Sequence, residues 1–297
     1  MKIEVHSISK SFGSTKAINE LSLSLDPGVI GLVGENGAGK STLFRLLSGV
    51  MHPDKGVILI DGFEASTVQA KEKIFYLSDD PYAEKDATPA SIYNLYSCFY
   101  KIDKEGYLSL LNELNLPLNK KIATFSKGMK RQTFIALSLN VDTEIMLLDE
   151  AFDGLDPLVV SIIKEKLLLK AEEGKLIFIA SHNISTLDRL CERFVLLYKG
   201  SLAVNGQEQD MASSMVKYQA AFKGEFSEGK FKAYGFEVIS YQKLGSIHNF
   251  VIKEDETRIE ALRREEEPIL LEQVPIAPDE AIALRMALAR KESKEGE

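Results

Sequence analysis

Along most of the chain, short runs of apolar residues alternate with stretches in which apolar residues recur every three or four positions. The apolar runs that predict buried strands are residues 29–33, 74–77, 145–148 and 176–180. Residues 158–173 predict an amphipathic helix, and residues 3–12 and 21–25 alternate apolar and polar side chains as half-buried antiparallel strands do. The pattern predicts an α/β fold that opens with a β-layer.

A helical insert interrupts this core at about residues 80–125. Its apolar residues recur at helical spacing from 89 to 118 with a break near Asp103, which predicts two or three helices. Four aromatic residues in the insert fit either core packing or a docking surface: Tyr93, Tyr96, Phe99 and Tyr100.

The last part of the chain has a different character. Residues 236–251 predict a hairpin, residues 258–264 a charged helix and residues 278–290 a helix that begins acidic and ends basic. The tail from 291 to 297 is expected to be frayed. We therefore expect one domain over residues 1–220 and a small α+β appendage over residues 225–297.

A glycine-rich loop follows the strand at 29–33 and precedes apolar residues at helical spacing. Glycines let the backbone turn tightly enough to point successive N–H groups at a phosphate, and the following helix adds its positive dipole end. Lys40 is placed to reach the β- and γ-phosphates, and the Ser41 hydroxyl to ligate Mg²⁺. The predicted phosphate-binding loop is Gly34, Glu35, Asn36, Gly37, Ala38, Gly39, Lys40, Ser41 and Thr42.

Two adjacent carboxylates, Asp149 and Glu150, end the apolar run at 145–148. This places both acids at the carboxyl end of a buried strand, where α/β sheets bind their ligands. Asp149 is the expected partner of Mg²⁺, usually through water, and Glu150 is placed to accept a proton from an attacking water. His182 leaves the strand at 176–180 on the same edge, and we expect it to contact the γ-phosphate.

Composition narrows the function classes. The chain has 297 residues with 36 basic and 44 acidic side chains, a formal charge of −8, so no global field attracts nucleic acid. The two cysteines cannot build a disulfide framework. The chain shows neither a signal-peptide pattern nor a long uncharged apolar stretch, so we expect it in the cytoplasm.

The order of these motifs resembles the ATP-binding cassette (ABC) ATPase family over about residues 1–220. Besides the glycine loop, Asp149, Glu150 and His182, the resemblance includes the turn Ser126-Lys127-Gly128 at a helix start and the turn Gly154-Leu155-Asp156. It implies a P-loop ABC ATPase core with an antiparallel β-subdomain, a helical insert and a small α+β C-terminal appendage. It also implies a head-to-tail dimer, homo- or heteromeric, with two ATP molecules at the interface.

The resemblance assigns roles residue by residue. Phe12 would stack on adenine, and Ser126 and Gly128 would meet the γ-phosphate bound by the opposite subunit. Asp156 would lie in the turn between the two sites. Asp79 stands where the family commonly has a Mg²⁺-sensing Gln, and Lys127 stands where the family signature has a Gly.

Both departures are similar to bacterial exporter-type cassettes. We therefore expect an ATP-hydrolysing subunit, with ATP and Mg²⁺, that drives export through a separate integral membrane permease and sits peripherally on the cytoplasmic face. The alternative is a soluble ABC ATPase switch that acts on a ribosomal or regulatory partner. A nucleotide sensor that barely hydrolyses is a third possibility, against which Glu150 and His182 argue.

Overall fold

The computed structural model describes residues 2–207, 215–253 and 255–295. The chain divides into two compact units, Met1–Asn205 and Gly206–Glu297. The division falls earlier in the chain than the expected boundary near residue 220. Each unit is described by itself.

The β-layer of the first unit is an antiparallel sheet in the order β2-β1-β4-β5. Its strands are β1 (Ile3–Phe12), β2 (Thr15–Leu25), β4 (Lys55–Ile60) and β5 (Phe63–Glu64). The inward residues of β1, such as Ile3, Val5 and Ile8, are buried, as the alternation of apolar and polar residues along this strand predicts. The prediction of an opening β-layer is confirmed.

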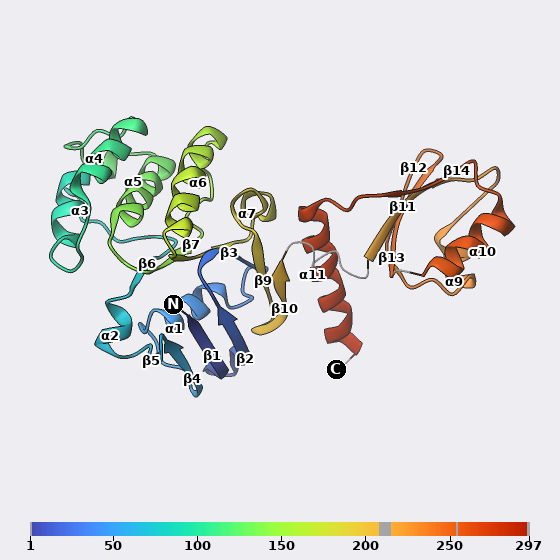
Figure 1. The fold of residues 1–297 in the computed structure, drawn as a ribbon, viewed down its shortest axis with the longest axis horizontal. Coiled ribbons are helices and arrows are strands. Elements are labelled where there is room, and N and C mark those ends of the chain that lie inside the picture. Colours follow the sequence, from blue (N-terminus) through green and yellow to red (C-terminus); the bar gives the residue numbers. More distant parts are fainter. Residues whose placement is uncertain (1, 208–214, 254, 296–297) are drawn as a thin grey trace. The chain divides into compact units, whose positions relative to one another are not determined.

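A second, six-stranded sheet has the order β10-β9-β3-β8-β7-β6 (Figure 1). Strands β9, β3, β8, β7 and β6 run parallel to one another. The strands are β3 (Gly28–Val33), β6 (Ile74–Leu77), β7 (Ile145–Asp149), β8 (Leu176–Ser181), β9 (Arg193–Tyr198) and β10 (Ser201–Gln207). Because parallel strands are covered on both faces, β7 and β8 are buried at every residue, as their continuous apolar runs require.

Helix α1 (Lys40–Leu47) lies in the core between the two sheets. Its buried Leu43, Phe44 and Leu47 belong to one cluster with inward residues of both sheets. Helices α6 (Pro157–Glu172) and α7 (Ile184–Leu190) also pack against β3 and β8. The glycine loop is thus held between a buried strand and a buried helix.

The helical insert follows the short helix α2 (Val68–Lys71) and the edge strand β6, and its helices gather beside that edge in Figure 1. It contains α3 (Pro89–Tyr96), α4 (Lys104–Glu113), the 3-10 turn η1 (Ile122–Thr124) and α5 (Lys127–Asn140). Thr88 caps α3, and Asp103, at the predicted break, caps α4. The aromatic residues of the insert differ in their environment, since Tyr93 stacks on Tyr107, whereas Phe99 is 77% exposed.

The second unit alternates strands and helices as βαββαβ, followed by a last helix. Its elements are β11 (Met215–Ala221), α9 (Glu228–Ala233), β12 (Val238–Leu244), β13 (Ile247–Lys253), α10 (Glu256–Glu266), β14 (Leu270–Val274) and α11 (Pro278–Glu295). The antiparallel sheet has the order β12-β13-β11-β14, which is the split βαβ arrangement. An aromatic cluster around Phe231 and Phe250 packs α9 and α10 on one face.

The predicted hairpin, charged helix and C-terminal helix are therefore present in this unit, but β11, α9 and β14 were not predicted. The expectation of a frayed tail is wrong for residues 291–295, which continue α11; residues 296 and 297 lie outside the described residues. No helix among the described residues is long and apolar enough to cross a membrane.

Candidate active site

The glycine loop lies at the carboxyl end of β3 and leads into α1. Gly37 and Gly39 have φ values of 83° and 106°, which favour glycine, and a Cβ on Gly39 would lie 2.4 Å from the Ala17 carbonyl oxygen. No side chain caps α1 at Gly39. The N–H groups of the first helical turn therefore remain available to an anion, as the sequence predicts.

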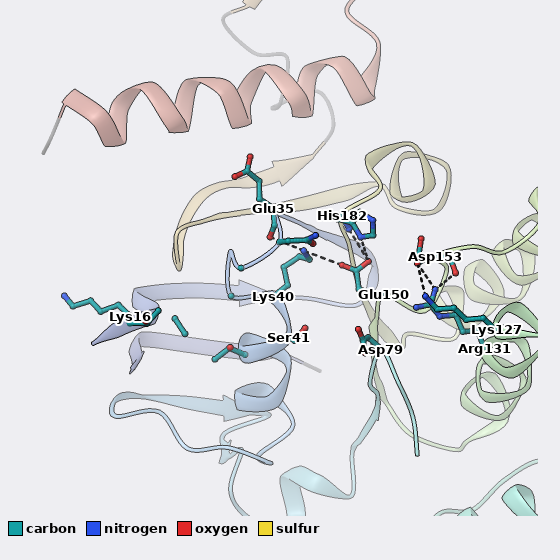
Figure 2. Close-up of a pocket in the computed structure, with 16 residues that line it drawn as sticks. Lys16, Glu35, Lys40, Ser41, Asp79, Lys127, Arg131, Glu150, Asp153 and His182 are labelled. Atoms are coloured by element: carbon teal, nitrogen blue, oxygen red, sulfur yellow. Dashed lines mark hydrogen bonds and ion pairs between the residues drawn. The ribbon is translucent and has the colours of Figure 1, made fainter. Parts of the chain in front are cut away.

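Lys40, the first residue of α1, is only 6% exposed and points back into the loop. Its ammonium donates to the carbonyl oxygens of Gly34 at 2.8 Å and Glu35 at 3.3 Å. The same nitrogen lies 3.4 Å from Oε1 of Glu150 (Figure 2). A buried ammonium whose charge is only partly neutralised by its neighbours is suited to bind phosphate oxygens.

Glu150 follows β7 in a left-handed conformation with φ 48°, which turns its side chain into the pocket. Its Oε2 lies 2.9 Å from Nδ1 of His182 and 3.3 Å from the His182 backbone N–H. Because Asp149 pairs with Ala180 in the parallel sheet, Glu150 and His182 leave their strands at one edge. The structure therefore brings together the two side chains that the sequence placed on separate strands.

Asp149 lies behind the pocket at the end of β7 and is 1% exposed. Burial raises the pKa of this carboxyl, an effect that the Ser41 hydroxyl opposes and that the negative charges of Glu150 and Asp79 increase. Its Oδ1 is buried and accepts no hydrogen bond from any residue that the structure describes. A buried carboxylate oxygen without a hydrogen bond either lowers the stability of the folded protein or is satisfied by a ligand.

These residues fit a magnesium ion. Mg²⁺ prefers oxygen donors and is commonly held by one or two carboxylates together with substrate phosphates and water. Ser41 and Asp149 supply such oxygens, and Asp79 lies on the same pocket. Among the described residues, no three His, Cys, Asp or Glu side chains gather into a metal site. A metal here would depend on the nucleotide for the rest of its ligands.

An opposite wall of the pocket is formed by α5 and the turn after β7. Arg131 is 8% exposed and donates through Nη1 both to the Asp153 carbonyl oxygen and to Asp153 Oδ2, the latter at 3.0 Å. Lys127 lies 3.7 Å from the same carboxylate (Figure 2). The Arg131 guanidinium holds the pKa of Asp153 below its ordinary value.

Together these walls enclose a pocket of about 390 Å³ that is large enough for a small-molecule ligand. The sequence-predicted residues that line it are Glu35, Asn36, Gly37, Gly39, Lys40, Ser41, Thr42, Asp79, Glu150 and His182. Cationic Lys16, Lys40, Lys127 and Arg131 line the same pocket. Four carboxylates, those of Glu35, Asp79, Glu150 and Asp153, line the pocket as well, so an anion would be held locally by Lys40 and the N–H groups of the glycine loop and not by the net charge of the pocket.

Other predicted residues do not line this pocket. Gly34 and Ala38 shape the loop from behind: a Cβ on Gly34 would lie 2.7 Å from the Leu197 carbonyl oxygen and 3.0 Å from the Ala38 Cβ. Ser126 caps α5 by accepting from the Met129 N–H at 3.2 Å, and Gly128 follows in the first turn. Asp156 caps α6 by accepting from the Leu158 N–H at 2.8 Å.

Phe12 is 49% exposed at the end of β1 and does not line the pocket either. Phe12 is therefore not part of the hydrophobic core. Phe12 pairs across the β1–β2 hairpin with Thr15, which does line the pocket. The stacking of Phe12 on adenine stays a prediction.

Sequence reasoning missed several pocket residues. Thr15, Lys16 and Ala17 belong to β2, whose start carries no motif. Arg131 had a weak signal, since it lies four residues after Lys127 and so on the same side of a helix. Asp153, directly before the turn Gly154-Leu155-Asp156, belongs to no motif of the Sequence analysis.

The chain matches the family model described as "ABC transporter" over residues 18–153. It is 30% identical to an uncharacterized ABC transporter ATP-binding protein of Methanocaldococcus jannaschii over 72% of this chain and 80% of that protein. It is 30% identical to Nod factor export ATP-binding protein I of Rhizobium etli, over 72% of this chain and 71% of the relative. It is 33% identical to the methionine import ATP-binding protein MetN 1 of Listeria innocua, over 70% of this chain and 67% of the relative.

Solved structures agree with these relatives. A structure titled as the ATP binding subunit of an ABC transporter superposes with a TM-score of 0.66 at 28% identity, covering 71% of this chain and 92% of that one. The sequence-based expectation of an ABC ATPase core is thereby confirmed.

Proposed function

The chain belongs to the ABC transporter family of ATP-binding proteins and is an ATPase of that family, and on this premise we propose that it energises transport through a separate membrane permease. In this proposal the chain binds the permease at the cytoplasmic face of the membrane, works with a second cassette subunit and moves its substrate outward. The observation that supports binding to a permease is an apolar groove on the helical insert.

Within the pocket, the proposed reaction is ATP + H₂O → ADP + phosphate. The glycine loop and Lys40 hold the phosphates, and Glu150, fixed between Lys40 and His182, accepts the proton of the attacking water. His182 orients Glu150 and is placed to contact the γ-phosphate. Ser41 and Asp149, with Asp79 nearby, would hold Mg²⁺, which supplies charge neutralisation on the phosphates when bound.

A second cassette subunit would complete the site. Ser126 is exposed and Gly128 half-buried, and neither lines the pocket of its own subunit. This supports a role for the Ser126–Gly128 turn at the nucleotide of the opposite subunit. Lys127, 76% exposed at the same turn, would add a positive charge where the family signature has a glycine.

The apolar groove lies where β6 meets α3. Its volume is about 470 Å³, and it is lined by Tyr76, Leu77, Ser78, Pro81, Tyr82, Leu95, Tyr96, Phe99 and Tyr100. Tyr82, Phe99 and Leu95 are 84%, 77% and 58% exposed, which is unusual for so many large apolar side chains on one surface. An apolar groove rimmed by aromatics suits a short amphipathic helix of a permease.

The tagged full chain, purified from its host in mild detergent, tests this partner. We expect a polytopic membrane protein to co-purify, and we expect the double variant Tyr82→Ala and Phe99→Ala to lose it while keeping basal ATP hydrolysis. Leu158→Ala is the matched control, because Leu158 is equally apolar and 71% exposed but lies on α6. Ribosomal or soluble regulatory proteins in place of a membrane protein would instead identify an ATP-driven switch.

The direction of transport needs its own test, since the relatives include one named for export and one named for import. The turn Ser126-Lys127-Gly128-Met129 favours export because of its similarity to exporter-type cassettes. Inside-out membrane vesicles should accumulate a compound from host cell extract when ATP is added. ATP-driven loss of a compound from preloaded vesicles would contradict export and support import.

A further inference from the structure

Tyr76 approaches the Asp149 carboxylate from the neighbouring strand. The parallel register of β6 and β7 pairs Tyr76 with Leu147, two residues before Asp149. Because side chains alternate along a strand, Tyr76 and Asp149 emerge on the same face of the sheet. The Tyr76 hydroxyl donates to Asp149 Oδ2 at 3.5 Å, a long hydrogen bond.

Helix α1 covers this pair. The Phe44 ring meets the Tyr76 ring edge-on, with centroids 6.3 Å apart at 87°, so the tyrosine is held by packing as well as by its hydroxyl. Arg45, one position further along α1, interacts with the phenol oxygen. Ser41, one turn earlier on the same helix, faces Asp149. Helix α1, which follows the glycine loop, therefore also holds Tyr76 in place.

The protonation of Tyr76 defines the direction of its hydrogen bond. A phenol is protonated at physiological pH, so the Tyr76 hydroxyl has one proton to donate. Arg45 has only donors to offer, and it therefore uses a lone pair of the phenol oxygen. The single phenol proton remains for Asp149 Oδ2, while Oδ1 accepts no hydrogen bond within the described part of the chain.

We propose that Tyr76 is a positioning residue for Asp149 in the ATPase reaction. Its hydroxyl occupies Oδ2 and restricts rotation of the carboxylate, so that Oδ1 is the oxygen left for the metal ion or its water. This inference rests on the role proposed above for Asp149. Groups that orient a metal-binding carboxylate typically change metal affinity or activity by about 10- to 100-fold when removed.

Tyr76→Phe removes only the hydroxyl and keeps the ring against Phe44. Tyr107→Phe is the matched control: Tyr107 is buried in α4 and donates to the Pro89 carbonyl oxygen at 3.1 Å, so removal of its hydroxyl also costs one hydrogen bond, but away from the pocket. Asp149→Asn completes the set. The full-length variants are compared by phosphate release over a range of Mg²⁺ and ATP, and by electron paramagnetic resonance titration of Mn²⁺ in the presence of ATP.

For Tyr76→Phe we expect turnover about 10-fold lower, weaker Mn²⁺ binding and a higher Mg²⁺ requirement. Binding of a fluorescent ATP analogue without metal should stay unchanged, because the glycine loop and Lys40 are untouched. Tyr107→Phe should behave like the unmodified protein in every assay. If the Tyr76 hydroxyl had only a structural role, Tyr76→Phe would not change turnover and Mn²⁺ binding while leaving metal-free binding of the ATP analogue intact.

Two outcomes overturn the inference and differ in what they imply. If Asp149→Asn loses hydrolysis and Mn²⁺ binding while Tyr76→Phe matches Tyr107→Phe, the positioning role of Tyr76 fails alone. If Asp149→Asn itself keeps both properties, the role proposed for Asp149 fails, and the inference about Tyr76 fails with it.

Discussion

His182 Nδ1 lies 2.9 Å from Glu150 Oε2, and the His182 backbone N–H points at the same oxygen from 3.3 Å. The two residues are 32 positions apart in the sequence, and they meet because β7 and β8 are neighbours that run parallel and end at one edge. With Oε2 held by His182 and Oε1 facing Lys40, the carboxylate has a fixed orientation. A fixed carboxylate beside a phosphate-binding loop is what a general base for an attacking water requires.

We therefore expect Glu150→Gln to lower turnover by about 10²-fold or more while ATP still binds, since the amide keeps the shape of the side chain and loses its basicity. Phosphate release and equilibrium binding of ATP measure the two properties separately. Glu144→Gln is the control, because Glu144 lies just before β7, at the opposite end of that strand, and pairs with Lys73 on the surface. Normal turnover in Glu150→Gln would remove Glu150 from the role.

Phe12→Ala should weaken ATP binding by about 3- to 10-fold, the scale on which a single aromatic stacking contact contributes. Phe63→Ala provides a matched comparison, since Phe63 is 44% exposed in the same sheet but lies on β5 at the far edge. Titration with ATP and with inorganic triphosphate distinguishes the cause. Stacking on the base predicts a loss for ATP only; equal losses for both ligands would contradict it.

Asp149→Asn should raise the stability of the nucleotide-free protein by about 1 kcal/mol at pH 7, even though it lowers hydrolysis. Burial raises the pKa of Asp149, so the folded state disfavours the charged form and this cost appears as pH rises through the unfolded value of about 4. Denaturant unfolding in EDTA measures the difference, which should shrink towards zero below pH 4. A variant less stable than the unmodified protein at pH 7 would show that the carboxylate is satisfied.

The Arg131–Asp153 contact gives a prediction of opposite sign. Arg131→Met should lower the free energy of unfolding by about 1 kcal/mol at pH 7, because it removes a charged hydrogen bond. The partial exposure of Asp153 reduces the contribution of that hydrogen bond. Lys127→Met should cost less than about 0.5 kcal/mol, because its 3.7 Å ion pair is largely in solvent.

The pH dependence checks this mechanism. The pKa of Asp153 is lowered chiefly by the Arg131 hydrogen bond, so the stabilisation is complete above the unfolded value of about 4 and is lost as pH falls through the lower folded value. The difference in thermal stability between the unmodified protein and Arg131→Met should therefore become smaller at acid pH, although the hydrogen bond from Arg131 to the Asp153 carbonyl oxygen does not titrate. A difference that stays constant down to pH 3 would assign the loss to that backbone hydrogen bond or to packing of the arginine stem.

The sequence determined the local parts of the site. A glycine loop between an apolar strand and a helix needs only neighbouring residues to form, so Gly37, Gly39 and Lys40 could be recognised from their spacing. Asp149 and Glu150 at the end of an apolar run likewise imply the carboxyl edge of a buried strand. Strands β1, β3, β6, β7 and β8 and helix α6 followed from the same periodicity, whereas the short helices α2 and α7 were not predicted.

Tertiary structure alone decided which of these parts meet. The contacts of Arg131 with Asp153 and of Tyr76 with Asp149 depend on strand order and register, which local periodicity does not specify. In the second unit, β11 and β14 flank each other although they lie far apart in the chain, and neither carries a clear alternation. Their pairing is stabilised by burial against α9, α10 and the central strand, so it arises only when the whole sheet forms.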